Sequence, residues 1–165
     1  MCARRLPFLL LLLPAAAAAL ETDPQAPVHI TADQVVIEEK TGISRFTGSV
    51  RMTQGSLTVE GDSVVLYAEP PRGKVRRIVV TGRPARFRQR PGPGAAFVDG
   101  QARRMVYETA SARLLLEGAA RLVQGPNEFS GERIEYDTRR SVVTASGGEG
   151  GPRVRTIIQP EGTGP

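Results

Sequence analysis

The chain has 165 residues, a formal net charge of +5, 18 glycines and 13 prolines, with one cysteine and no tryptophan. This length is sufficient for one domain. The excess of positive charge is too small to indicate a nucleic acid partner, and a single cysteine excludes an internal disulfide. The glycine and proline content favours many short strands joined by turns.

Residues 1–19 are predicted to be a cleavable signal peptide rather than part of the fold. Arg4 and Arg5 precede an apolar run over 6–13, and the small residues at 17–19 form a cleavage site. An uncleaved membrane anchor is the alternative, but the apolar run is short for a bilayer span of roughly 20 residues. Cys2 lies before the run, so the mature chain would contain no cysteine.

The remainder of the chain shows short runs of alternating apolar and polar residues and no sustained helical period. A single β domain is predicted over residues 28–159, followed by a flexible tail at 160–165. The expected strands are 28–38, 43–53, 56–60, 63–68, 75–81, 84–89, 96–98, 102–108, 111–117, 119–124, 127–130, 132–137, 140–145 and 153–158.

The domain contains an internal repeat, because residues 32–67 align without a gap on residues 102–137 at a constant offset of 70. Glycines, turns and apolar positions keep the same phase in both copies, which predicts an elongated structure built from one strand-turn module. General similarity between β sequences is the alternative. Gly48 and Gly118 interrupt equivalent strands, where glycine indicates a bulge or bend, or a plain turn.

Alternation within the runs predicts one apolar face and one solvated face for each sheet. The residues expected to face inward, as candidates for ligand contact or for core, are Val35, Ile37, Phe46, Val50, Met52, Val59, Val64, Leu66, Phe87, Met105, Tyr107, Leu114, Leu116, Leu122, Phe129, Ile134 and Tyr136.

The sequence offers no catalytic constellation. His29 is the only histidine and is expected at a surface or edge, and no spacing indicates a metal site, a phosphate loop or any other cofactor site. We therefore expect a binding or structural protein rather than an enzyme. The basic segment 72–90 places Arg86, Arg88 and Arg90 on one strand face, which is compatible with phosphate contact or with a solvated, edge-protecting face.

Several motifs together resemble the OstA-like domain of lipopolysaccharide transport proteins. They are Ile30-Thr31-Ala32-Asp33 and the segments 46–55 (FTGSVRMTQG), 59–64 (VEGDSV), 82–87 (GRPARF), 116–122 (LEGAARL) and 153–160 (RVRTIIQP). The resemblance implies an all-β fold, a twisted V-shaped jelly roll of two antiparallel sheets with an open groove between them. It also implies a periplasmic protein whose copies stack head to tail and whose groove holds the acyl chains of lipopolysaccharide, in its lipid A part.

The function implied by this resemblance is a periplasmic carrier that helps lipopolysaccharide move from the inner to the outer membrane. Its partners would be inner-membrane and outer-membrane transport components with the same β fold. Two alternatives remain, an inner-membrane-anchored relative in the same system and a periplasmic β scaffold without a lipid ligand. The apolar inward face is shared by the carrier and the scaffold, so the sequence does not separate them.

Overall fold

The computed structural model describes residues 26–71, 73–148, 151 and 153–159, and all regular structure within them is β. The predicted signal peptide and tail lie outside these residues. The strands are β1 (His29–Thr31), β2 (Gln34–Glu38), β3 (Ile43–Gln54), β4 (Leu57–Ala68), β5 (Val75–Gln89), β6 (Val98–Glu108), β7 (Arg113–Gln124), β8 (Asn127–Asp137), β9 (Val142–Ser146) and β10 (Arg155–Ile157).

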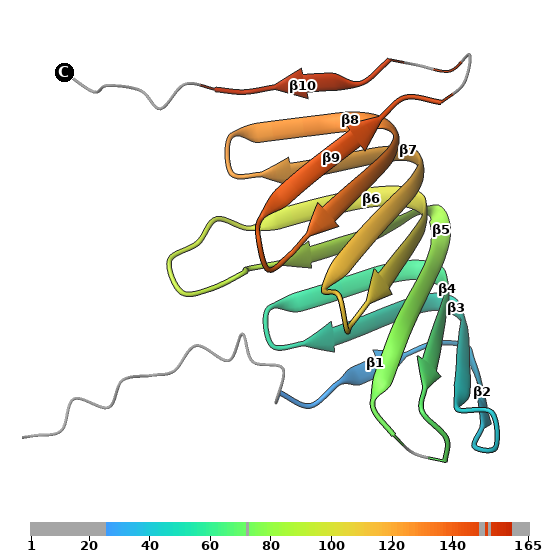
Figure 1. Cartoon of the computed structure of the whole chain (residues 1–165). Coiled ribbons are helices and arrows are strands. Elements are labelled where there is room, and N and C mark those ends of the chain that lie inside the picture. Colours follow the sequence, from blue (N-terminus) through green and yellow to red (C-terminus); the bar gives the residue numbers. More distant parts are fainter. Residues whose placement is uncertain (1–25, 72, 149–150, 152, 160–165) are drawn as a thin grey trace, which may run out of the picture.

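The strands form one antiparallel sheet that does not close (Figure 1). Six long strands follow one another from β3 to β8 in hairpin order. At one end, β3 pairs with both β1 and β2, and at the other end β8 pairs with both β9 and β10. Each end of the sheet therefore carries two short edge strands.

The long strands bend halfway along their length. Every successive pair from β3 to β8 has a register shift in the middle of its strands, at Thr47/Val50, Glu60/Ser63, Thr81/Ala85, Gln101/Arg104 and Glu117/Ala120. Such bulges bend a strand and increase its twist. The halves on either side of the bend form two arms of a V, which Figure 1 shows opening on one side. We call the arm with β1 and β10 the first arm and the arm with β2 and β9 the second arm.

This arrangement confirms the predicted fold class, with the two sheets realised as two arms of one bent sheet. It also confirms the repeat, because β3 and β7 span equivalent residues at the offset of 70. The backbone repeats as well: φ is 82° at Gly48 and 81° at Gly118, 44° at Ser49 and 50° at Ala119. The interruptions at Gly48 and Gly118 are thus bulges with left-handed backbone rather than plain turns.

Several predicted strand boundaries are wrong, because the bend within a long strand looks in the sequence like the end of a short one. Residues 56–60 and 63–68 belong to the single strand β4, and the same holds for the predicted pairs that make up β5, β6, β7 and β8. Conversely, the predicted strand 28–38 is split into β1 and β2. The split falls at Asp33, whose N–H donates to the carbonyls of Thr47 and Gly48 at 3.1 Å each, across the bulge of β3.

The two bulge glycines are covered by equivalent residues of the repeat, but not equally tightly. A Cβ built on Gly48 would lie 2.1 Å from Oδ2 and 2.7 Å from Cβ of Asp33. A Cβ built on Gly118 would lie 3.0 Å from Cβ of Arg103, a milder overlap that a shift of a few tenths of an ångström relieves. Gly48 therefore combines a φ that favours glycine with a steric restriction that Gly118 largely lacks.

We expect Gly48→Ala to lower the free energy of unfolding by about 2–3 kcal/mol, because alanine is strained at this φ and its Cβ collides with Asp33. Gly118→Ala should cost less, about 1 kcal/mol, from the backbone strain alone. Gly92→Ala is the control, since a Cβ there meets nothing within 4 Å. Urea unfolding of the three variants measures the order, and equal losses at 48 and 118 would contradict the role given to Asp33.

Candidate functional site

The inner face of the second arm is a continuous apolar surface. Antiparallel partners in register point to the same side of a sheet, and the register joins one row across β2 to β9. This row consists of Val35, Phe46, Val64, Val80, Met105, Leu116, Ile134 and Ala145. A second row, nearer the free end of the arm, consists of Ile37, Ser44, Leu66, Ile78, Tyr107, Leu114, Tyr136 and Val143.

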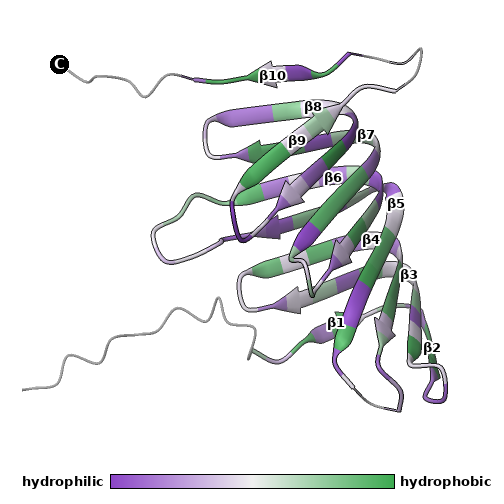
Figure 2. Cartoon of the chain, in the orientation of Figure 1, coloured by the Kyte–Doolittle hydropathy of each residue, from purple (hydrophilic) through white to green (hydrophobic). Residues whose placement is uncertain are grey.

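The first arm presents a matching row, Ile30, Met52, Val59, Phe87, Gly100, Leu122 and Phe129. Gly100 is required here, because a Cβ at this position would lie 2.0 Å from Cε1 of Phe87. The Phe87 ring therefore lies over the backbone of the neighbouring strand. Apolar and polar residues alternate along the strands of the first arm, whereas the second arm carries continuous apolar stretches such as 78–80 and 114–116 (Figure 2).

The two inner faces meet in one hydrophobic cluster. Leu122 on the first arm and Val64, Leu116 and Ile134 on the second arm are fully buried, with 0% exposure. In this structure the space between the middles of the arms is therefore filled by the protein's own side chains. Any ligand chain between the arms has to replace part of this packing.

The structure brings most of the sequence-predicted inward residues together in this cluster. The buried ones are Val50, Met52, Val59, Val64, Phe87, Met105, Leu114, Leu116, Leu122, Ile134 and Tyr136, and those partly buried against them are Phe46, Leu66, Tyr107 and Phe129. Val35 and Ile37 also belong to the inner rows but are exposed, because β2 is an edge strand. Ligand contact by any of them stays a prediction.

Sequence reasoning missed several members of the cluster, among them Val80, Ala85, Val98, Ala102 and Ala120. Residues 78–80 are all apolar, so alternation did not single out Val80. Ala120 shares the even phase of Leu116 and Leu122, whereas Ala85 and Ala102 stand at register shifts that interrupt the period of two. Ala85 pairs directly with Ala102, so small side chains lie where the two arms join.

Exposed large apolar side chains of the described residues occur only at the two ends of the sheet. Those at the N-terminal end are Val28, Val35, Val36 and Ile37, and those at the C-terminal end are Val142, Val154, Ile157 and Ile158. Ile37 is 62% exposed and Ile158 is 69% exposed. A hollow of about 260 Å³ lies beside β2 and is lined in part by Ile37, Ser44 and Pro71. Apolar exposure next to unpaired strand edges is typical of surfaces that add another strand.

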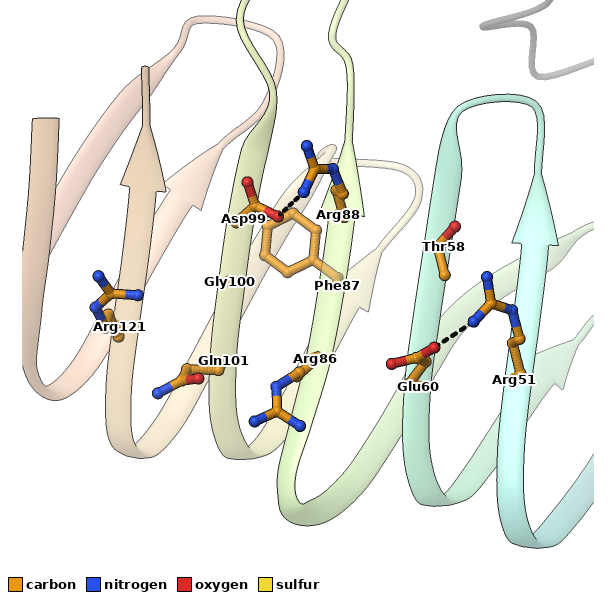
Figure 3. A pocket seen from close by; sticks show the side chains of 10 residues that line it. All are labelled: Arg51, Thr58, Glu60, Arg86, Phe87, Arg88, Asp99, Gly100, Gln101 and Arg121. Carbon is orange, nitrogen blue, oxygen red and sulfur yellow. Dashed lines mark hydrogen bonds and ion pairs between the residues drawn. The ribbon is translucent and has the colours of Figure 1, made fainter. Parts of the chain in front are cut away.

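A second hollow, of about 370 Å³, lies on the outer face of the first arm (Figure 3). It is bordered by Arg51, Arg86 and Arg121. Each of these arginines is next in sequence to an inward-facing residue and therefore points to the opposite, outer side of the sheet. Arg51 pairs with Glu60 at 2.5 Å, whereas Arg86 forms no ion pair with a described residue. Charged side chains surround this hollow, and Phe87 and Gly100 of the inner row also contribute to its lining.

The basic segment is largely accounted for by pairing. Arg88 lies 3.4 Å from Asp99 and 4.1 Å from the ring centroid of Phe97, and Arg90 lies 4.4 Å from the same centroid. These contacts favour the solvated-face interpretation for Arg88, because its charge already has a partner. Arg72 lies outside the described residues.

The described residues show no group of three or more histidine, cysteine, aspartate or glutamate side chains placed to hold a metal ion. His29 is exposed on the edge strand β1, opposite Thr53. Within the part of the chain described here, we find no helical segment with the length and apolar character of a membrane span.

An unclosed, bent antiparallel sheet with an apolar interior and two bare edges defines the class of protein to which this chain belongs. Residues 29–142 match the model of the family described as LptA/(LptD N-terminal domain) LPS transport protein. The chain is therefore a member of this lipopolysaccharide transport family.

Individual relatives belong to the same lipopolysaccharide transport family. The lipopolysaccharide export system protein LptH of Pseudomonas aeruginosa is 31% identical over 151 residues, which cover 88% of this chain and 86% of the relative. LptA of Escherichia coli K12 is 33% identical over 144 residues, covering 86% and 76%. The crystal structure of P. aeruginosa LptH, described as the LptA homologous periplasmic component of a lipopolysaccharide transport device, has a TM-score of 0.76 at 29% identity. It covers 84% of this chain and 99% of that one.

The ion pair between Arg121 and Glu128 gives the outer face a pH-dependent contribution to stability. Two hydrogen bonds of 2.7 Å from the Arg121 guanidinium lower the pKa of the Glu128 carboxyl below its ordinary value of 4.5. A carboxyl with a lowered folded-state pKa stabilises the fold above its unfolded-state pKa and ceases to do so as pH falls through the folded-state value.

We therefore expect Glu128→Gln to lower the melting temperature slightly at pH 7. The difference from the unsubstituted chain should vanish once the pH falls below the lowered folded-state pKa of Glu128. Glu132→Gln is the control, since Glu132 forms no ion pair with a described residue. Thermal unfolding followed by circular dichroism over a pH series gives the result. A difference that persists at low pH would show that Glu128 acts through packing rather than charge.

Proposed function

We propose that this protein is a periplasmic carrier that holds the acyl chains of lipopolysaccharide between its two arms and helps move the lipid from the inner to the outer membrane. The observation that carries the proposal is the pair of apolar inner faces, which run across the whole sheet from β2 to β9. The sheet is not closed, and the inner rows end in the exposed side chains of Val35 and Ile37 on β2.

A shielded apolar surface addresses the physical obstacle to lipid transport through water. Hiding one acyl chain of about a dozen carbons is worth on the order of 10 kcal/mol, at ~0.8 kcal/mol per methylene. No chemical step is needed to lower such a barrier. The carrier needs only to offer the chain an apolar environment that continues from one subunit to the next.

The arms can separate to admit such a chain without loss of the sheet. All ladder hydrogen bonds join neighbouring strands within an arm, because pairing runs from strand to strand on either side of the bend. Apolar side chains of the hydrophobic cluster pack across from one arm to the other. An acyl chain placed between the arms replaces apolar contacts with apolar contacts, so the exchange keeps most of the buried area.

The filled interior also supports a second candidate, a β scaffold without a lipid ligand, since the lipid-free core is complete as it stands. Adjacent residues on opposite faces separate the two functions. Leu116 faces the interior with 0% exposure, and Leu115 lies on the outer face opposite Val106 and Glu135.

A photo-crosslinking residue at Leu116 is expected to capture lipopolysaccharide in cells, and the same residue at Leu115 is expected to capture none. Phe46 and Tyr136 give further inward positions on β3 and β8. The lipid adduct is detected by immunoblotting for both protein and lipopolysaccharide. If none of the positions Phe46, Leu116 and Tyr136 gives a lipopolysaccharide adduct, the carrier function is refuted and the β scaffold without a lipid ligand is favoured.

We further propose that copies assemble head to tail, and that the same ends meet inner-membrane and outer-membrane components of the same β fold. The edges β1 and β2 would pair with β9 and β10 of the next copy. Main-chain hydrogen bonds would supply affinity, and the exposed apolar side chains at both ends would be covered. The inner faces of successive copies would then join into one surface.

Two variants, each blocked at one end, test the direction of assembly. Deletion of residues 153–165 removes β10, and Val35→Asp places a charge on β2. Each variant alone is expected to lose concentration-dependent growth in size-exclusion chromatography, while remaining folded by circular dichroism. A mixture of the two should form dimers, because each chain keeps one intact end. Absence of dimers in the mixture, or oligomers of either variant alone, would contradict head-to-tail assembly.

A further inference from the structure

Tyr136 places a polar atom inside the apolar interior. The side chain is 2% exposed and belongs to the hydrophobic cluster between the arms. Its direct neighbours in the sheet are Leu114 on β7 and Val143 on β9. The hydroxyl oxygen is buried and has no hydrogen-bond partner among the described residues. Buried hydroxyls without a partner are uncommon because they lose their hydration without compensation.

The position of Tyr136 within the arm is as informative as its burial. It is the second-last residue of β8 and lies in the inner row nearer the free end of the second arm, beyond Ile134. The first repeat has Leu66 at the equivalent place, so the hydroxyl is particular to the C-terminal copy. An acyl chain that enters tip first from the open side would come to rest with its headgroup end at this row.

The surroundings restrict the chemistry of the group that could meet this hydroxyl. No charged or strongly polar side chain among the described residues is fully buried. A phosphate would therefore lack a countercharge here. An amide would bring an N–H that needs its own acceptor, whereas an ester carbonyl offers only acceptor sites. One hydroxyl donor in an apolar setting suits an ester carbonyl.

Building on the carrier function proposed above, we propose that the Tyr136 hydroxyl donates a hydrogen bond to the carbonyl oxygen of an ester-linked acyl chain held between the arms. In the lipid-free protein the unpaired hydroxyl lowers the stability of the fold, and in the lipid complex it donates to the ester carbonyl. Tyr136 thus favours acylated lipids over plain hydrocarbon and fixes how deep the chain sits.

The test compares Tyr136→Phe with the unsubstituted protein and with Tyr67→Phe. Tyr67 pairs with Ile43 and Arg77 and lies on the outer face of the second arm. Binding of fluorescently labelled lipopolysaccharide is expected to weaken about five- to tenfold for Tyr136→Phe, the loss of one neutral hydrogen bond. It should change less than about twofold for Tyr67→Phe. The melting temperature of lipid-free Tyr136→Phe should equal or exceed that of the unsubstituted protein, since no partner is lost.

A second readout identifies the acceptor. The infrared ester carbonyl band of bound lipopolysaccharide should lie at lower frequency with the unsubstituted protein than with Tyr136→Phe. Unchanged affinity, an unchanged ester band or a lowered melting temperature in Tyr136→Phe would each overturn the proposal. If the unsubstituted protein binds no lipopolysaccharide, the carrier function fails instead. If the unsubstituted protein and Tyr136→Phe bind lipopolysaccharide equally well, the Tyr136 proposal fails and the carrier function stands.

Discussion

The structure depends on the line of register shifts that crosses the sheet between its two arms. Each long strand passes through this line and continues on the other arm, so the same strand contributes to both inner faces. The line is built from glycines and alanines, including Gly48 and Gly118 with left-handed backbone and the pair Ala85 and Ala102. A continuous straight strand in these places would give a flat sheet, with its apolar face open to water.

The bend also corrects the phase of the side chains. In β4 the inward residue of the first arm is the odd-numbered Val59, and those of the second arm are the even-numbered Val64 and Leu66. In a regular strand, odd and even positions would face opposite sides of the sheet. The shift between Glu60 and Ser63 provides the missing step. In β3 the phase is unchanged, with Phe46 and Val50 both inward, because the bulge of β3 contains Gly48 and Ser49. Two kinds of irregularity therefore lead to one apolar interior.

This explains what could be predicted from the sequence and what could not. Alternation found the inward residues on each side of the bend, because the period of two holds within each half-strand. The repeat was visible because both copies need the same glycines at the same bulge. The continuity of β4, β5, β6 and β8 was not visible, since a change of phase looks like the end of a strand. In β7 the phase is kept, and it is Gly118 that looks like the end of a strand. The exposure of Val35 and Ile37 was missed as well, because alternation gives the face of a residue but not its distance from an edge.

The outer faces of the two arms carry cross-strand ion pairs. Examples are Arg77 with Glu108 at 2.5 Å and Glu117 with both Arg104 and Arg133 at 2.5 and 2.8 Å. Such exposed pairs add little stability, but a charged surface opposes side-by-side association. The ends differ, since they combine unpaired strand edges with exposed valine and isoleucine side chains. Charge on much of the outer surface and apolar side chains at the ends therefore support the head-to-tail assembly proposed above, in which the inner apolar faces of successive copies would become continuous.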